Sequence, residues 1–312
     1  GAGKWGMNHI RTLNELGALG AVVDKKNHLI NDVKKMYPSC DVFNELFEAI
    51  KFDFDGFIIA TPPHTHFELG KQVIEARKPV LIEKPLTLDY ASAKKLNDLA
   101  KKENVKLMVG HVLLFHPAFI KIKEIIDSGT IGEIQYLYSN RLNLGTFRTD
   151  ENVFWSFAPH DISIFNHLLG ESPLSIHSNG ADILQKNIHD ITLASFKYSG
   201  NITGHIFVSW LHPFKEHRFI IIGSEGMLSF EDSSKQKPLI LYDKKAELID
   251  FIPNAKIGEN KNISYGTTSP LTNELKYFIS SIDSNEINIA SGDSAVEVIK
   301  ILEIASKSLD YS

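Results

Sequence analysis

The chain opens on the glycine-rich run Gly1-Ala2-Gly3-Lys4-Trp5-Gly6, which constrains the fold more than any other feature. Glycines at this spacing allow a tight turn, a close approach of the backbone to a bound pyrophosphate, and close packing of a helix on a strand. Ile10, Leu13 and Leu16 then recur at helical spacing, and Gly17 ends the helix. Because the free N–H groups of a helix N-terminus favour an anion, the run predicts a dinucleotide site. The expected cofactor-binding residues in it are Gly1, Gly3, Lys4, Trp5 and Gly6.

An acidic residue follows at the interval that such a site requires. Leu19 to Val23 read as a strand that ends at Asp24, and the usual interval from the glycines is about 20 residues. We predict that Asp24 accepts hydrogen bonds from the adenosine ribose, where a carboxylate would repel a 2′-phosphate, so NAD is favoured over NADP. Lys25 and Lys26 keep NADP open, and an ordinary turn aspartate is the other interpretation of Asp24.

Short apolar runs alternate with helical stretches up to about Gly110, as in a parallel sheet covered by helices. The expected strands are 19–23, 56–60, 80–82 and 105–109, and the expected helices are 27–36, 65–76 and 87–102. We therefore predict an α/β fold with a Rossmann domain, a doubly wound parallel sheet, over residues 1–110. A glycine turn of this kind ordinarily follows a first strand, so we expect that the leading strand is missing from the chain.

The pattern changes after His111. We expect helices at 117–127, 271–282 and 294–309, and strands at 134–143, 191–198, 202–210, 218–222 and 227–230. Short turns between consecutive strands, such as Ser199-Gly200-Asn201, indicate an antiparallel sheet. Residues 111–312 are therefore predicted to form a second α/β domain whose sheet is mostly antiparallel.

Composition excludes several classes of partner. The 312 residues carry a formal net charge of −5 and no basic run, so neither nucleic acid nor a membrane surface is expected. No segment approaches the ~18 consecutive apolar residues of a membrane span, and the start has no signal-peptide pattern. The single cysteine, Cys40, excludes an internal disulfide framework, is expected to be a buried small side chain, and fits a reducing cytoplasm.

The loop Thr61-Pro62-Pro63-His64-Thr65-His66 follows an expected strand, at the edge where open α/β sheets bind ligands. Two prolines restrict its backbone. We predict that Thr61, Pro62 and His66 line the nicotinamide ribose pocket. A metal site built from His64 and His66, with His111 or His116, is the alternative; it is disfavoured because no carboxylate or cysteine accompanies them in the run, and no metal is expected.

Lys84 ends the apolar run Val80-Leu81-Ile82 and lies between Glu83 and Pro85. A lysine at the end of a strand in a dinucleotide-binding domain places an ammonium beside the cofactor. We predict that Lys84 is catalytic and that Glu83 belongs to the cofactor site.

Two of the five arginines, Arg141 and Arg148, fall in one short run before the pair His160-Asp161. Arginine can hold a carboxylate or phosphate with two parallel hydrogen bonds, so the run indicates an anionic substrate, with surface ion pairs as the alternative. His160 is the candidate base, against the alternative of a core histidine. The expected substrate-binding residues are Arg141, Asn143, Arg148, Asn152, Trp155 and Asp161.

Together these residues resemble a known family. The opening glycines, Ala60-Thr61-Pro62-Pro63, Glu83-Lys84-Pro85, the His160 region and the late Pro270-Leu271…Glu274…Phe278 pattern are similar to the glucose-fructose oxidoreductase and inositol dehydrogenase (Gfo/Idh/MocA) family. The resemblance implies a Rossmann domain followed by an α/β domain whose open, mostly antiparallel sheet often builds the oligomer interface, and hence a homodimer or homotetramer.

The run from Arg141 to Arg148 and the segment Trp155 to Ile162 most resemble bacterial UDP-N-acetylglucosamine-type 3-dehydrogenases. That resemblance implies oxidation at C3 of a UDP-N-acetylglucosamine or UDP-N-acetylglucosaminuronate, ahead of an aminotransferase in polysaccharide biosynthesis. Many family members have an aspartate four residues before the histidine, where this chain has Ser156, so the group that orients His160 is left open. The alternatives are a dehydrogenase of a free polyol or sugar, inositol-like, and a non-catalytic NAD-binding regulator.

The expected reaction moves a hydride from a secondary alcohol to NAD. His160 would take the hydroxyl proton, because a histidine pKa of about 6.5 suits a general base near neutral pH. Lys84 would stabilise the developing alkoxide. The two roles could also be exchanged, and the sequence leaves that choice open.

Overall fold

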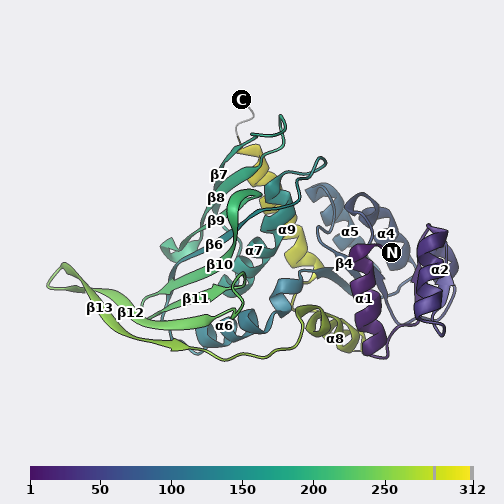
Figure 1. Ribbon diagram of the computed structural model, residues 1–312, viewed down its shortest axis with the longest axis horizontal. Helices are drawn as coiled ribbons and strands as arrows, with labels where there is room; N and C mark the ends of the chain where they lie inside the picture. Colours follow the sequence, from purple (N-terminus) through teal and green to yellow (C-terminus); the bar gives the residue numbers. More distant parts are fainter. Residues whose placement is uncertain (284–285, 310–312) are drawn as a thin grey trace. The chain divides into compact units, whose positions relative to one another are not determined.

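The structure, a computed structural model, describes residues 1–283 and 286–309. The chain forms two compact units (Figure 1). Unit 1 contains Gly1–Phe115 and Thr268–Lys300, and unit 2 contains His116–Thr267 and Ile301–Ser312. The sequence had suggested one division at residue 110, with everything after it in the second domain. The chain instead returns to unit 1, because helix α8 (Pro270–Asp283) buries Leu275 and Phe278 and packs against α1 (Lys4–Glu15).

Unit 1 contains short parallel strands with helices between them. Its other elements before residue 116 are β1 (Ala21–Val23), α2 (Asn27–Met36), β2 (Asp41–Phe43), α3 (Leu46–Ala49), β3 (Phe57–Ile59), η1 (Pro63–Thr65), α4 (His66–Glu75), β4 (Val80–Glu83), α5 (Tyr90–Lys102), β5 (Leu107–Gly110) and η2 (Val112–Phe115). Helix α9 (Gly292–Lys307) begins in unit 1 and ends in unit 2. Every residue of β4 and β5 is buried, as expected for parallel strands covered on both faces. The predicted parallel sheet is confirmed.

The parallel strands of unit 1 form two sheets. β1 pairs with β2, and β3 pairs with β4, which pairs with β5. Among the strands described, β1 and β3 do not pair with each other. Cys40 is free and lies in the small core beneath β1, with Val22 and Val33.

Unit 2 is built on one eight-stranded sheet in the order β13-β12-β11-β10-β6-β9-β8-β7. All neighbouring strands are antiparallel except β6 and β9, which are parallel. Its elements are α6 (Pro117–Asp127), β6 (Ile134–Leu144), α7 (Val153–Leu169), β7 (Ser175–Ala181), β8 (Ile191–Lys197), η3 (Ser199–Asn201), β9 (Thr203–Ser209), β10 (Leu211–Gly223), β11 (Met227–Glu231), β12 (Leu239–Ile249) and β13 (Ile252–Asn262). The predicted mostly antiparallel sheet is therefore confirmed.

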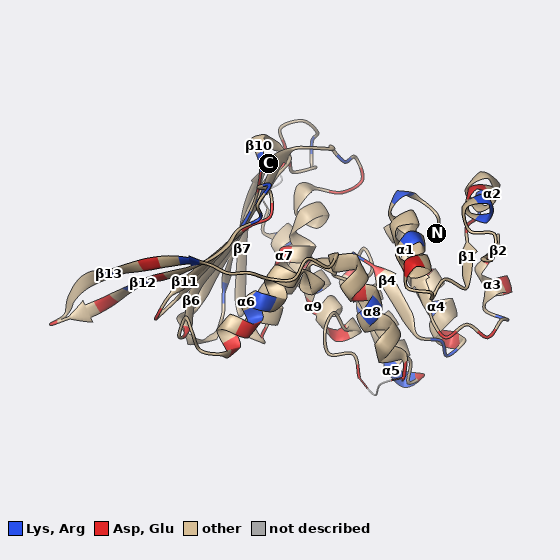
Figure 2. Ribbon diagram, turned by 60° about the horizontal axis from the view of Figure 1, so that its bottom comes forward, with Lys and Arg blue, Asp and Glu red and all other residues tan. Residues whose placement is uncertain are grey.

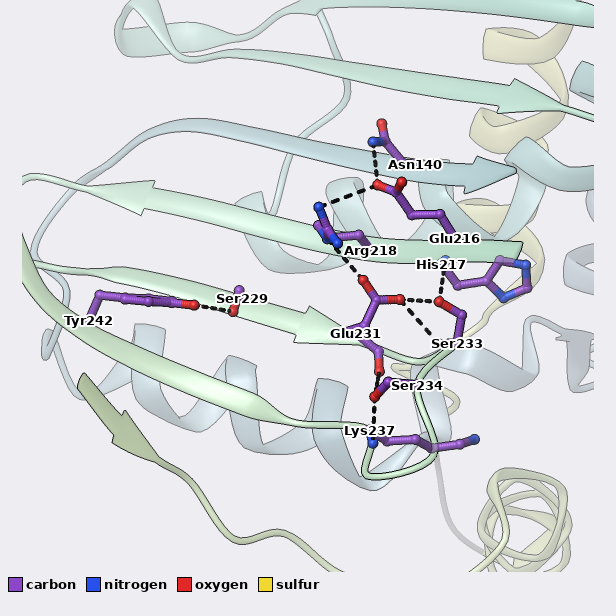
Figure 3. Close-up of polar contacts among 10 residues, drawn as sticks. All are labelled: Asn140, Glu216, His217, Arg218, Ser229, Glu231, Ser233, Ser234, Lys237 and Tyr242. Atoms are coloured by element: carbon purple, nitrogen blue, oxygen red, sulfur yellow. Dashed lines mark hydrogen bonds and ion pairs between the residues drawn. The ribbon is translucent and has the colours of Figure 1, made fainter. Parts of the chain in front are cut away.

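The two faces of this sheet have different surroundings. Burial alternates along the strands, so that Ile206 and Val208 are fully buried while Phe207 between them is half-buried. Helices α6 and α7 lie on the buried face (Figures 1 and 2). On the other face, which no described helix of unit 2 covers, Arg218 of β10 lies between Glu216 and Glu231, and Asn140 of β6 donates to Glu216 (Figure 3).

Four helices and strands that the structure describes in unit 2 were not expected from the sequence: α7, β7, β12 and β13. α7 contains Pro159 and is buried around much of its circumference, so it shows no simple amphipathic stripe. The hairpin of β12 and β13 is largely exposed, so its strands lack the alternation of a half-buried sheet. Within residues 1–283 and 286–309, no helix has the length and apolar character needed to cross a membrane.

Candidate active site

The glycine turn leads directly into α1, as predicted. A Cβ on Gly6 would lie 2.0 Å from the carbonyl oxygen of Gly1, so only glycine fits there without a backbone shift. A Cβ on Gly3 would meet nothing within 4 Å. Gly3 caps α1 without a side-chain hydrogen bond, which leaves the first N–H groups of the helix available to an anion. Lys4 and Trp5 lie exposed on the first turn.

Asp24 links the end of β1 to this turn. Its Oδ2 accepts a hydrogen bond from the Ala2 N–H at 2.8 Å, and its Oδ1 accepts one from the Lys26 N–H at 2.9 Å. The second contact is that of an ordinary turn aspartate. Asp24 can therefore hold the turn and still be available to accept from the ribose. Each oxygen keeps a second lone pair with which it could accept from a ribose hydroxyl.

A cavity of about 1020 Å³ lies in unit 1 beside these residues. Gly1, Gly3 and Asp24 line it, as do Thr61 and Pro62 from the loop after β3. Residues of both β1 and β3, which belong to different sheets, also line it. Open space at Gly3, an uncapped helix N-terminus and the Asp24 carboxylate form a donor and acceptor set that fits a dinucleotide.

The loop after β3 is tied internally and to the next strand. The Thr61 and Thr65 hydroxyls lie 2.6 Å apart, and the Thr65 hydroxyl donates to the Pro62 carbonyl at 2.7 Å. His66 is only 1% exposed, and both of its ring nitrogens contact backbone carbonyl oxygens. His66 could therefore act on a cofactor only through the loops that it contacts.

Glu83 accepts several hydrogen bonds at the end of β4. It is buried and accepts hydrogen bonds from the Trp5 indole N–H, from His9 Nε2 at 2.7 Å and from the Lys84 N–H at 3.1 Å. Burial raises the pKa of Glu83, but these donors together lower it by more than burial raises it. The pKa of Glu83 therefore lies below its ordinary value. Glu83 is thus an anion that holds α1 against the end of β4, beside the half-buried Lys84.

Two buried groups near Glu83 had no expected part in the NAD site, and His111 had been considered only as a ligand of the alternative metal site. Burial lowers the pKa of His111 to about 4, with Glu83 and Lys84 acting on it in opposite directions, so its ring is neutral at pH 7. Glu274 of α8 is 0% exposed, and neither carboxylate oxygen has a hydrogen-bond partner among the described residues. Burial and then Glu83 raise the pKa of Glu274 well above its ordinary value, which favours its protonated, neutral form. Only the late Pro270-Leu271…Glu274 pattern signalled it.

In unit 2 the predicted substrate residues Arg141 and Asp161 bind each other. Arg141 of β6 donates from Nε and Nη2 to the two Asp161 oxygens, both at 2.9 Å, and the Ser139 hydroxyl also donates to Asp161 at 2.7 Å. The Asp161 side chain is 0% exposed and that of Arg141 is 13% exposed. This bidentate pair joins α7 to the sheet, and direct substrate contacts by either residue remain predictions.

The other expected substrate residues lie on β6, the loop after it and the start of α7. Asn152 is the N-cap of α7 and accepts from the Trp155 N–H at 3.0 Å, while the Trp155 indole donates to the Ser306 hydroxyl at 2.9 Å. Arg148 is exposed, 3.8 Å from Glu151. Asn143 is half-buried near the end of β6. None of these four positions tests a substrate role.

His160 is half-buried on α7, and its neighbour Asp161 is fully buried against Arg141. Successive helical residues point about 100° apart, so Asp161 does not share the direction of His160. Ser156, one turn earlier, is also largely buried. Within the described parts of the chain, no three histidine, cysteine or acidic side chains form a group that could hold a metal ion.

Comparison with known families agrees with this geometry. The model described as "Oxidoreductase family, NAD-binding Rossmann fold" matches residues 1–111, and the GFO/IDH/MocA C-terminal domain model matches residues 119–229. Myo-inositol 2-dehydrogenase of Thermotoga maritima is 24% identical over 329 residues, which cover 99% of this chain and 95% of that protein. Inositol 2-dehydrogenase of Rhizobium meliloti is 29% identical over 61% of this chain and 59% of its own length.

Solved structures share the fold. The UDP-N-acetylglucosamine 3-dehydrogenase GnnA from Acidithiobacillus ferrooxidans superposes with a TM-score of 0.86 at 22% identity, covering 99% of this chain and 95% of that one. GenD2 from gentamicin A biosynthesis, solved in complex with NAD, gives a TM-score of 0.81 at 20% identity, with coverage of 99% and 92%. The glycine turn, the Glu83-Lys84 strand end and both family models together show that the chain is an NAD-binding oxidoreductase of the Gfo/Idh/MocA family.

Proposed function

We propose that the protein is an NAD-dependent dehydrogenase that oxidises a secondary alcohol of a nucleotide sugar, at C3 of UDP-N-acetylglucosamine or UDP-N-acetylglucosaminuronate. The observation that carries the dehydrogenase assignment is Lys84, which follows the buried anion Glu83 at the end of a strand in the NAD-binding unit. The fold likeness to GnnA supports the nucleotide sugar. Arg148, whose side chain is 53% exposed, is available to a diphosphate.

Each proposed catalytic group has one task. His160 takes the proton of the sugar hydroxyl, and Lys84 donates a hydrogen bond to the oxygen as it gains negative charge. Glu83 holds the end of β4 through its contacts with Trp5 and His9, and so fixes the backbone from which Lys84 extends. NAD, when bound against Gly3 and Asp24, supplies the hydride acceptor. The exchanged assignment, with Lys84 as base, remains within the proposal.

Turnover assays with single variants test these roles. Lys84→Met and His160→Asn should each lower kcat by at least about a hundredfold while NAD still binds. Lys71→Met, on the surface of α4, is a control for the loss of a lysine from unit 1. Wild-type turnover by either catalytic variant on the true substrate would overturn the assignment of that residue.

Oxidation of a free polyol is the second candidate, favoured by the relatives named as inositol dehydrogenases. NADH formation across UDP-sugars and inositols distinguishes the candidates. Arg148→Met should raise KM for a UDP-sugar about tenfold or more, as for loss of a charge-assisted hydrogen bond, and Arg77→Met should not. Turnover of inositol alone would refute the nucleotide sugar. NAD binding without turnover of either substrate class would favour the non-catalytic regulator.

We also propose a homodimer or homotetramer that covers the open face of the unit 2 sheet. Tyr136, Tyr138, Ile220 and Ile222 lie half-buried on that face, and an apolar patch of this kind often marks an interface. Light scattering should give at least two subunits, and Ile220→Asp should reduce that number. A monomeric wild-type protein would refute the proposal.

A further inference from the structure

One buried side chain joins the two loops that carry the proposed nicotinamide pocket and Lys84. His66 is the first residue of α4, and its ring is 1% exposed. Nε2 lies 2.8 Å from the Thr61 carbonyl oxygen, in the loop after β3. Nδ1 lies 2.8 Å from the Pro85 carbonyl oxygen, directly after Lys84. β3 and β4 are paired neighbours, with Ile59 opposite Ile82, so the ring connects the carboxyl ends of adjacent strands.

A carbonyl oxygen only accepts hydrogen bonds, so the ring must be the donor in both contacts. A neutral imidazole has one N–H and donates to one oxygen at a time, whereas the imidazolium donates to both. Burial lowers the pKa of His66 by more than the two carbonyl groups and the Glu83 carboxylate raise it, so the pKa lies below its ordinary value and the neutral ring, with a single N–H donor, is favoured. In either state the ring has no free polar atom to offer to a ligand.

We propose that His66 is a positioning residue that fastens the Thr61 loop to the Lys84-Pro85 turn, with one ring nitrogen facing each loop and donating to it whenever that nitrogen carries a proton. The bond to Thr61 holds the wall of the nicotinamide pocket, and the bond to Pro85 holds the backbone of the catalytic lysine. The proposal rests on the proposed function for its kinetic part only. The two contacts and their effects on the loops exist whether or not the substrate is a sugar.

Substituting His66 with asparagine or with glutamine distinguishes the contact with Pro85 from the contact with Thr61. The amide nitrogen of asparagine falls close to the position of Nδ1, and that of glutamine falls close to the position of Nε2. His66→Asn should therefore keep the donor to Pro85 and lose the one to Thr61, and His66→Gln should do the reverse. His66→Phe removes both. His28→Asn, on the exposed first turn of α2, controls for the loss of a histidine from unit 1.

We expect the two variants to affect different constants, NAD affinity in one and kcat in the other. His66→Asn should weaken NAD binding about fivefold with kcat nearly unchanged, and His66→Gln should lower kcat about fivefold with NAD affinity nearly unchanged, as for loss of one hydrogen bond. Thermal unfolding identifies any variant that fails to fold. A merely structural histidine would give equal losses in both constants for both variants, and that result would overturn the proposal.

Two measurements need no substrate. NAD affinity can be titrated by protein fluorescence, and hydrogen exchange can be followed for the peptide that spans residues 80–90. Exchange there should quicken in His66→Gln and stay at the wild-type rate in His66→Asn, because only the latter keeps the Pro85 contact. Equal exchange in both variants would refute the clamp. A failure of the proposed function would show instead as absent turnover with these two readouts intact.

Discussion

Replacing Glu274 with glutamine should stabilise the protein at neutral pH and have little effect in acid. Glu274 lies fully buried on α8, without a hydrogen-bond partner among the described residues and near the anion Glu83. Burial followed by repulsion from Glu83 raises its pKa, so the folded protein keeps Glu274 protonated where the unfolded chain ionises it. Glutamine has nearly the same shape and is neutral at every pH.

The sign and size follow from proton linkage. A carboxyl whose folded pKa is raised binds more protons in the folded state, so the free energy of unfolding falls as pH rises from 4.5 towards the folded pKa. The free energy of unfolding falls by about 1.4 kcal/mol for each pH unit between the unfolded and the folded pKa of Glu274. Glu274→Gln removes that decrease. The variant and the wild type should have similar stability below pH 4.5, where both chains are neutral at this position.

Urea unfolding followed by circular dichroism between pH 4 and pH 8 measures the effect. The quantity of interest is the difference in free energy of unfolding between variant and wild type, which cancels groups that titrate alike in both. That difference should grow in favour of the variant as pH rises. Glu68→Gln, on the exposed surface of α4, is the matched control. A difference that stays flat with pH, or a variant less stable than the wild type at pH 7, would refute the reasoning.

Other substitutions test the remaining parts of the site. Arg141→Met should destabilise unit 2 by about 3–5 kcal/mol because it leaves Asp161 buried without its partner, and adding Asp161→Leu should restore most of the loss in urea unfolding. Gly6→Ala should destabilise unit 1 by about 1–3 kcal/mol, because its Cβ would meet the Gly1 backbone, whereas Gly3→Ala should keep stability and weaken NAD binding in a fluorescence titration. Asp24→Ser should weaken NAD about tenfold or more and narrow its advantage over NADP, and an unchanged ratio of the two affinities would contradict the ribose role.

The sequence by itself determined the class of fold and the chemistry of the first site. The spacing of Gly1, Gly3 and Gly6 before a helix is a local signal, because a Cβ on Gly6 would meet the backbone of Gly1 within the same turn. Lys84 could likewise be predicted as a site residue, because ligands of open parallel sheets bind at the carboxyl ends of the strands. The alternating runs in β8 and β9 similarly predicted a half-buried antiparallel sheet, because period-two burial is imposed by the strand itself.

Only the tertiary structure decided what each polar side chain contacts. Arg141 and Asp161 were both predicted to bind substrate, but the packing of α7 against β6 brings their side chains together and buries them. His66 was predicted to bind the cofactor. In the structure β3 lies beside β4, and both ring nitrogens of His66 contact backbone carbonyl oxygens in the loops that follow these strands. Glu274, distant in sequence from Glu83, becomes its neutral neighbour because α8 returns to unit 1. Periodicity reports which face of an element is buried, whereas partners and protonation depend on elements that meet only after the chain has folded.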